Sequence, residues 1–189
     1  LDPEYALAWA SLSSACMVRG TGGWVPFAEA ADRARDAARR ALEVEPDLAV
    51  GHWALGAVQM FYDWDWKGAE ASVRRALRLA PEDAQLSVRA ARLMHNLGRL
   101  EAAAVLAQRA LELDPLNVDA HVASGLLLTS AGRLTEAESA FRTALELGPQ
   151  RVYVHFHLCN LYLLQRRIDD AMHEAEHEVD ETYRLQGTA

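Results

Sequence analysis

Five short junctions ending in proline divide this chain, and their spacing constrains the fold more than any other feature of the sequence. The junctions are Leu1-Asp2-Pro3, Val44-Glu45-Pro46, Leu79-Ala80-Pro81, Leu113-Asp114-Pro115 and Leu147-Gly148-Pro149, so successive prolines stand 43, 35, 34 and 34 residues apart. Proline ends the helix before it, because it lacks an amide hydrogen, but it is tolerated where the next helix begins. Each junction therefore marks the boundary of a repeated unit, and a period of this length is typical of paired helices.

Small residues recur at fixed places within the units. Ten residues after each junction proline stand Ser13, Gly56, Ala91, Gly125 and Cys159. Alanine recurs at two places before the next junction: Ala34, Ala69, Ala103, Ala137 and Ala171 at the first, and Ala41, Ala76, Ala110 and Ala144 at the second. Small side chains let two helix backbones approach closely, and a larger one there costs about 1–3 kcal/mol by overpacking. The pattern predicts two closely packed helices in each unit.

The composition also favours helices. The hydrophobic fraction of 51% is rich in alanine, aromatic residues make up 7%, and few runs of valine, isoleucine or threonine favour strands. We therefore expect an all-α fold, an α-solenoid of five helix-turn-helix repeats with about ten antiparallel helices. The expected helices are 3–18 and 26–44, 47–61 and 66–79, 82–97 and 100–112, 116–131 and 134–146, and 150–165 and 168–184. We expect one domain over 1–189, with repeats at about 3–45, 46–80, 81–114, 115–148 and 149–185. Because the chain starts inside a junction, we expect it to be a piece of a longer protein.

Charge and cysteine usage exclude several kinds of function. The formal net charge is −8, which opposes non-specific binding of nucleic acid, and the basic run from Arg33 to Arg40 is interleaved with acidic residues. Cys16 and Cys159 have no metal-ligand spacing and lie in apolar patterns, so we expect buried thiols in a reducing, cytoplasmic compartment. No apolar run approaches the ~20 residues that a membrane-spanning helix needs, so no membrane association is expected.

The repeated unit resembles the tetratricopeptide repeat along the whole chain. The fourth unit matches that pattern best, through Gly125, Gly132, Ala137, Phe141, Ala144 and Pro149, and Trp9 fills the aromatic position of the first unit. The resemblance implies a scaffold that binds proteins or peptides, with no catalytic residues, no metal and no cofactor. Chaperone-binding members hold a C-terminal carboxylate with lysine and asparagine, and the corresponding stripe of this chain has no lysine. That particular activity is therefore not expected here.

Two units depart from the pattern. The first has extra residues between its helices, from Arg19 to Pro26, and the second carries Tyr62-Asp63-Trp64-Asp65-Trp66 across its turn. We expect Asp65 to cap the following helix and Trp64 and Trp66 to plug the helix ends, with a ligand site as the alternative. Both departures resemble a bacterial subgroup in which such arrays follow a cyclase domain or a winged-helix regulator domain. This resemblance implies the regulatory arm of a signalling protein.

One stretch of the last unit has a catalytic pattern. His173-Glu174-Ala175-Glu176-His177 matches H-E-x-x-H, in which two histidines one helical turn apart hold zinc and the glutamate acts as a general base. A catalytic zinc needs a third protein ligand, and no third ligand follows at the usual spacing. Ala175 also occupies a packing position of the repeat. We therefore expect no metal site and no hydrolase, and we keep zinc-dependent hydrolysis through His173, Glu174 and His177 as a remote alternative.

The expected binding surface is the outward stripe of the first helix in each unit. Its residues stand seven, eight, eleven and fourteen positions after the junction proline: Trp53; Val88, Arg89, Arg92 and His95; Val122 and Leu126; and Phe156, His157 and Asn160. The stripe is apolar with two arginines, which suits a peptide that carries acidic and hydrophobic residues. The alternative is that the valines and Leu126 pack between repeats and that the arginines pair with carboxylates of the chain itself.

A third possibility is self-association. The last expected helix carries an apolar row of Ile168, Met172, Val179 and Leu185, with Glu178 where the earlier units have a small residue. Such a face could dock on a second copy of the chain or on another part of its parent protein. The sequence therefore leaves a homo-oligomerisation module as the alternative to partner binding.

Overall fold

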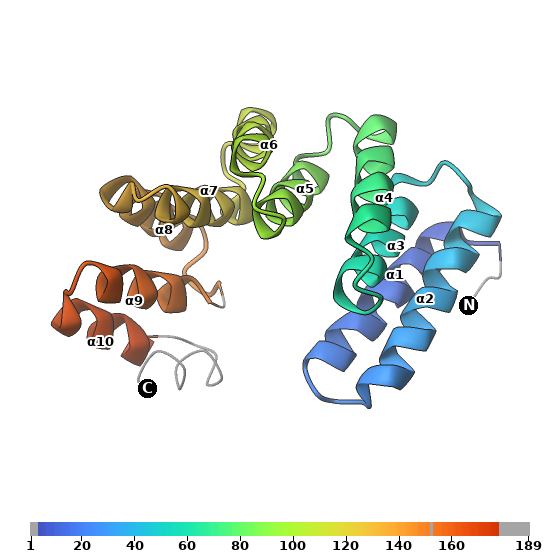
Figure 1. The fold of residues 1–189 in the computed structure, drawn as a ribbon, viewed down its shortest axis with the longest axis horizontal. Coiled ribbons are helices and arrows are strands. Elements are labelled where there is room, and N and C mark those ends of the chain that lie inside the picture. Colours follow the sequence, from blue (N-terminus) through green and yellow to red (C-terminus); the bar gives the residue numbers. More distant parts are fainter. Residues whose placement is uncertain (1–3, 152, 178–189) are drawn as a thin grey trace. The chain divides into compact units, whose positions relative to one another are not determined.

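The computed structural model describes residues 4–151 and 153–177, and within them every regular element is an α-helix (Figure 1). The helices are α1 (Ala6–Thr21), α2 (Phe27–Val44), α3 (Ala49–Phe61), α4 (Trp66–Leu79), α5 (Ala84–Asn96), α6 (Leu100–Leu113), α7 (Val118–Ser130), α8 (Leu134–Leu147), α9 (Val154–Leu164) and α10 (Ile168–His177). Each expected helix is present, and the all-α prediction is confirmed. Pro3 and the predicted helical residues 178–184 lie outside the described residues.

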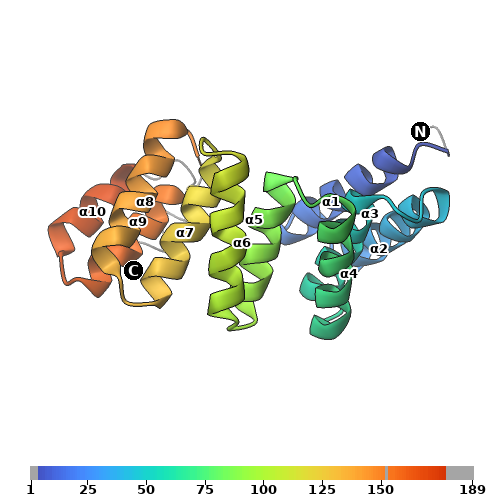
Figure 2. The same ribbon diagram turned by 90° about the horizontal axis from the view of Figure 1, so that it is seen from above.

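The helices group into two compact units, Leu1–Leu86 and Ser87–Ala189. In the first unit α1 packs against both α2 and α3, and α3 packs against α4. In the second unit each of the helices from α6 to α10 packs against the next, and α8 reaches α9 across a repeat junction (Figures 1 and 2). The expectation of one domain over 1–189 stays a prediction.

The first helix of each later unit begins two to four residues after its predicted start, because the junction forms a β-turn. The amide of Leu48 donates to the carbonyl of Glu45 (3.1 Å), and Asn117 donates in the same way to Asp114 (3.1 Å). The proline therefore occupies the second position of a turn, which its fixed φ favours, and does not open the helix. The helix starts after a capping residue, as where the Asn117 side chain accepts from the amide of Ala120 (3.0 Å).

The recurring small residues form the contact between the paired helices, as predicted. The first set of alanines, from Ala34 to Ala171, is at most 2% exposed, and the second set, from Ala41 to Ala144, is at most 1% exposed. Gly125 shows why the size matters, since a Cβ atom there would lie 2.5 Å from the ring of Phe141. Close packing of this kind leaves no room for a larger residue.

The aromatic turn between α3 and α4 differs from our expectation. Trp64 is 69% exposed and Trp66 is 36% exposed, so the prediction that they plug the helix ends is wrong. Tyr62 plugs the site instead: it is 8% exposed, its ring lies 4.6 Å from that of Phe27, and its hydroxyl donates to the carbonyl of Met17 (3.3 Å). Trp64 has a left-handed backbone (φ 55°), which turns its side chain away from the helices.

The cap of α4 and the two cysteines agree with the predictions. Asp65 caps α4, because its carboxylate accepts from the amide of Gly68 (2.9 Å), as predicted. Cys16 and Cys159 are buried free thiols, also as predicted. Among the described residues no helix is both long and apolar enough to cross a membrane.

Candidate functional site

The predicted partner-binding residues lie on the first helices of four repeats. Trp53 is on α3 in the first unit, and the other residues are on α5, α7 and α9 in the second unit. Arg92 is exposed, and six others are half-buried: Trp53, Arg89, His95, Leu126, Phe156 and Asn160. These seven side chains reach the surface, so the stripe is accessible over most of its length.

Three of these residues come together between α5 and α7. Arg92, His95 and Leu126 line a shallow depression of about 10 Å³, whose floor is formed by Ala91, Ala123 and Leu127. The Nε2 atom of His95 lies 2.8 Å from the hydroxyl of Ser130, which links the C-terminal ends of the two helices. The depression therefore has a fixed wall, an apolar floor and an exposed guanidinium at its edge.

Val88 and Val122 do not contribute to this surface, which corrects their assignment as partner-binding residues. Val88 is 1% exposed and packs with Ala110, Ala120 and Ala123, and Val122 is 5% exposed in the cluster around Phe141. Both stand seven residues after the junction proline. Neighbouring helices cover the two valines at this position, whereas the larger side chains of Trp53 and Phe156 at the same position still reach the surface. For these valines the alternative, packing between repeats, is what the structure shows.

A polar cluster that the sequence did not indicate lies near the same face. The carboxylate of Asp119 accepts hydrogen bonds from Arg151 and from the hydroxyl of Tyr153 (3.0 Å). Burial raises the pKa of Tyr153, Asp119 raises it further, and the positive charges of Arg151 and Arg92 act in the opposite direction. Arg92 is therefore close enough to this cluster to act on it electrostatically. Tyr153 has a left-handed backbone (φ 70°), which helical periodicity cannot predict.

In the H-E-x-x-H segment the two histidines are exposed and the glutamate is buried. His173 and His177 are exposed on α10, whereas Glu174 is 5% exposed and lies 2.6 Å from Nδ1 of His155 on α9. The glutamate is therefore turned into the helix pair and cannot serve as a base for a metal held by the two histidines. Among the residues that the structure describes, no group of three histidine, cysteine or acidic side chains is placed to hold a metal ion.

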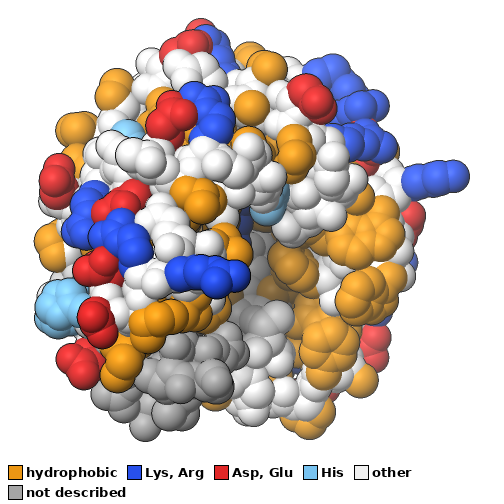
Figure 3. Space-filling model, turned by 60° about the vertical axis from the view of Figure 1, so that its left-hand side comes forward, with side chains coloured by type: hydrophobic (Ala, Val, Ile, Leu, Met, Phe, Trp, Pro, Cys, Tyr) orange, Lys and Arg blue, Asp and Glu red, His pale blue; other side chains and the backbone are white. Residues whose placement is uncertain are grey.

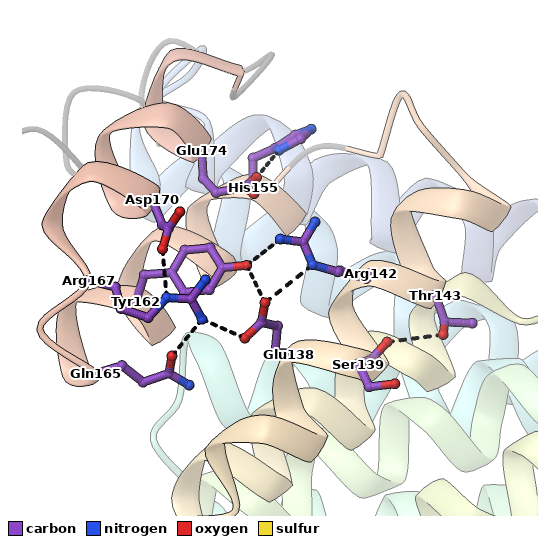
Figure 4. A network of polar contacts seen from close by, with 10 residues as sticks. All are labelled: Glu138, Ser139, Arg142, Thr143, His155, Tyr162, Gln165, Arg167, Asp170 and Glu174. Carbon is purple, nitrogen blue, oxygen red and sulfur yellow. Dashed lines mark hydrogen bonds and ion pairs between the residues drawn. The ribbon is translucent and has the colours of Figure 1, made fainter.

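The contact between α8 and the hairpin α9–α10 contains a network of polar side chains (Figure 4). Glu138 accepts from the hydroxyl of Tyr162 (2.8 Å) and from Arg167 (2.9 Å), and Arg142 donates to the same hydroxyl (2.6 Å). Arg167 also pairs with Asp170 (2.6 Å), and its guanidinium carbon lies 4.2 Å from the centre of the Tyr162 ring. Tyr162 is completely buried, so the network closes this junction from the inside.

The same network shifts the pKa values of its members. Burial acts to raise the pKa of the Glu138 carboxyl, but hydrogen bonds from Tyr162 and Arg167 outweigh it and lower that pKa. Burial, together with the hydrogen bond to Glu138, raises the pKa of Tyr162 to about 12. Glu138 is thus held as a carboxylate and Tyr162 as a neutral phenol, which is the state that keeps both hydrogen bonds.

Elsewhere on the surface, charges pair locally. On the face drawn in Figure 3, acidic and basic side chains are interspersed, with hydrophobic side chains between them. Examples of such pairs are Arg33–Glu29, Arg35–Asp63, Arg75–Asp47 and Arg133–Glu136. Exposed pairs of this kind contribute little to stability.

Comparisons with known proteins agree with this architecture. One model of the tetratricopeptide repeat matches residues 65–118 and 101–152, and a second model of the same repeat matches residues 128–177. No protein of curated function matches the sequence.

Several solved structures share the fold. TTC0263, a thermophilic tetratricopeptide protein of Thermus thermophilus, superposes with a TM-score of 0.76 at 18% identity, over 93% of this chain and 97% of its own. PilF of Pseudomonas aeruginosa gives a TM-score of 0.68 at 21% identity, over 95% of this chain and 78% of its own. YrrB, described as having an unusual peptide-binding site, gives 0.59 at 20% identity, over 99% of this chain and 93% of its own. At these identities the likeness extends to the fold alone.

Proposed function

The chain belongs to the tetratricopeptide repeat family, and we propose that it is a non-enzymatic scaffold that binds a peptide or a partner domain. Proteins of this family generally mediate protein–protein interaction. The proposed binding residues are those of the first-helix stripe that reach the surface in the second unit: Arg89, Arg92, His95, Leu126, Phe156 and Asn160. Trp53 is the proposed contact in the first unit.

The observation that carries this proposal is the depression between α5 and α7. It joins an exposed guanidinium at Arg92, an imidazole at His95 and the apolar side chain of Leu126. The chain as a whole has a net charge of −8, so the guanidinium of Arg92 supplies a local attraction for an acidic segment that the net charge of the chain repels. A segment with one acidic and one hydrophobic side chain would pair its carboxylate with Arg92 and lay its apolar side chain across Leu126, on the surface of the shallow depression.

The test is a charge reversal at the centre of the stripe. Random peptides displayed on phage are selected on the immobilised chain, and the bound pool is expected to be enriched in acidic and apolar residues. Arg89→Glu with Arg92→Glu should weaken binding of the selected peptides by at least about tenfold, since a hydrogen bond to a charged group is worth ~1.5–3 kcal/mol. Affinities are measured by fluorescence anisotropy.

A matched control makes the same change of net charge elsewhere. Arg39→Glu with Arg40→Glu alters two exposed arginines of α2, and this variant should keep its affinity. Circular dichroism and thermal melting establish that both variants are folded. A folded Arg89 and Arg92 variant that binds the selected peptides normally would exclude this stripe as the binding surface.

The biological setting is also a proposal. We place the chain in the regulatory arm of a bacterial signalling protein in the cytoplasm, supported by its resemblance to arrays that follow cyclase or winged-helix domains and by its two free thiols. Self-association remains the second candidate, because Ile168 and Met172 are 53% and 58% exposed on α10. Val179 and Leu185, the rest of that predicted face, lie outside the described residues. Sedimentation velocity distinguishes a monomer from an oligomer.

A further inference from the structure

The second unit contains two repeat junctions that are related by one repeat length. The first is formed by α6, α7 and the turn into α8, and the second by α8, α9 and the turn into α10. Because Pro115 and Pro149 are 34 residues apart, adding 34 to a residue number in the first junction gives its counterpart in the second. Each side chain of the first junction therefore has a defined counterpart in the second.

The second junction is filled. Tyr162 and Phe141 are 0% and 1% exposed, and both belong to the cluster that holds α8, α9 and α10 together. Glu138 and Arg142 bind the hydroxyl of Tyr162, and Arg167 covers its ring (Figure 4). An aromatic ring with a polar tip is thus the natural occupant of this position in the repeat.

The first junction lacks these groups, although its helices follow one another in the same order. Every one of the counterparts is smaller: Ala107 for Phe141, Leu128 for Tyr162, Ala104 for Glu138, Gln108 for Arg142, Ser124 for Leu158 and Ala131 for Gln165. The space that they leave is an open pocket of about 350 Å³, and all six of these residues line it. Ala104, Gln108 and Ala131 are exposed, so the pocket is accessible from solvent.

One element of the second junction is retained. Arg133 is the counterpart of Arg167, and it lies at the pocket beside Glu136, the counterpart of Asp170. The guanidinium of Arg133 donates two hydrogen bonds to the carboxylate of Glu136. One runs from Nε to one oxygen (2.7 Å), and the other runs from a terminal nitrogen to the second oxygen (2.5 Å). In the second junction the equivalent pair places the guanidinium over an aromatic ring. The first junction therefore keeps the group that covers a ring and lacks the ring.

We propose that the pocket between α6, α7 and the α7–α8 turn binds an aromatic side chain, tyrosine by preference, of a partner polypeptide. The ring lies between Ala107 and Leu128 under the guanidinium of Arg133, and its hydroxyl reaches Gln108, which stands in the place of Arg142. Burial of the ring supplies the affinity, and cation–π contact with Arg133 favours an aromatic over an aliphatic side chain. No residue of this pocket belongs to the first-helix stripe, although buried Leu127 lines both this pocket and the depression between α5 and α7.

The probe is N-acetyl-L-tyrosine amide, titrated into the ¹⁵N-labelled chain and followed by heteronuclear NMR. A ligand of this size binds weakly, with a dissociation constant on the order of 1 mM at best. We expect the amides of Ala104, Ser124, Leu128 and Ala131 to shift together and to saturate. N-acetyl-L-leucine amide should bind about two- to fivefold more weakly, since a cation–π contact is worth ~0.5–1 kcal/mol at exposed sites.

Two variants test the location. Ala104→Leu narrows the pocket from an exposed position and should weaken the tyrosine probe by at least about fivefold, because it occupies space that the ring needs. Ala102→Leu, an equal change at an exposed site of α6 outside the pocket, should leave binding unchanged. The double variant Ala104→Glu with Leu128→Tyr rebuilds the filled junction and should abolish binding of the probe.

The proposal fails if the probe shifts none of the four amides, or if Ala104→Leu and Ala102→Leu bind it equally. Equal binding of the leucine probe would overturn the assignment of an aromatic ligand. Arg89→Glu with Arg92→Glu should not affect the probe, so failure of the first-helix stripe and failure of this pocket are separate results.

Discussion

The junction closed by Tyr162 and the junction left open at Leu128 have the same helices in the same order, yet one is a packed core and the other is a pocket. Their buried alanines are equivalent, since Ala103, Ala110, Ala137 and Ala144 are all 0% exposed. What differs is a small set of residues that face the next repeat. The alanine contact inside each hairpin is thus the same at both junctions, whereas the filling between hairpins differs, and Phe141 takes part in both contacts because it also packs against Gly125 of α7.

This separation has a consequence for how such a chain can change. The buried alanines inside the hairpins recur in both repeats and leave no room for a larger side chain. Residues between hairpins can be exchanged for smaller ones without loss of the fold, since the first junction shows such a set in place. A repeat array can therefore gain a binding pocket by local loss of side-chain volume, at the expense of stability at that junction.

The largest expected effect comes from emptying the filled junction. Phe141→Ala gives the second junction the alanine that the first has at position 107. The ring is 1% exposed and packs against Gly125, so the change should lower the free energy of unfolding by about 3–5 kcal/mol. Urea denaturation measures it, with Val105→Ala as the control at a position that is 69% exposed. A loss below about 1 kcal/mol would mean that the second junction closes around the cavity.

The next effect concerns the buried phenol of Tyr162. Its pKa is raised from 10.0 to about 12, so the unfolded chain releases the phenolic proton at a lower pH than the folded chain does. The stability that this group contributes is present below pH 10 and is lost as the pH rises from 10 to 12, by up to about 3 kcal/mol. The open junction has Leu128 at the equivalent position, and leucine does not ionise, so this position adds nothing to the pH dependence of stability between pH 10 and 12.

Urea unfolding at a series of pH values across this range measures the loss. Tyr162→Phe should make the decline clearly shallower, although Tyr62 and Tyr153, whose pKa values are also raised by burial, maintain part of it. The variant itself should be less stable at neutral pH by about 1–3 kcal/mol, because Glu138 and Arg142 lose a partner. An unchanged decline in Tyr162→Phe would show that this phenol ionises as freely as an exposed one.

The hairpins could be predicted from the sequence because their determinants are local and repeated. The junction prolines and the alanine positions lie within one repeat length, and they indicated each helix that the structure describes. The start of each first helix was predicted too early, because the proline occupies a turn and the capping residue follows it. Trp64 was expected to be buried because aromatic side chains usually pack, but its left-handed backbone turns it outward.

The surface was harder to predict, since it depends on contacts between repeats. Helical spacing alone placed Val88 and Arg89 on one stripe, and only the neighbouring helix shows that Val88 is covered. The pocket at Ala104 and Leu128 has a signature in the sequence that lies between repeats and not within one. At a set of positions one repeat has small side chains, and the next repeat has large ones 34 residues later.

The smallest expected effect concerns the turns that close the two junctions. The turn after α7 has Gly132 in the left-handed region (φ 73°), and the turn after α9 has Arg166 at the equivalent place (φ 60°). A residue with a Cβ atom loses about 1–2 kcal/mol in this conformation, whereas glycine in the unfolded chain loses about 0.5–1 kcal/mol more conformational freedom on folding. Arg166→Gly should therefore stabilise the chain by about 0.5 kcal/mol, measured as a higher urea midpoint with an unchanged slope.

Gly132→Ala, the reverse change in the open junction, should be destabilising. If both variants shift the urea midpoint in the same direction, the side-chain contacts at this turn outweigh its backbone conformation. The two junctions would then differ in their turns as well as in the residues that fill them.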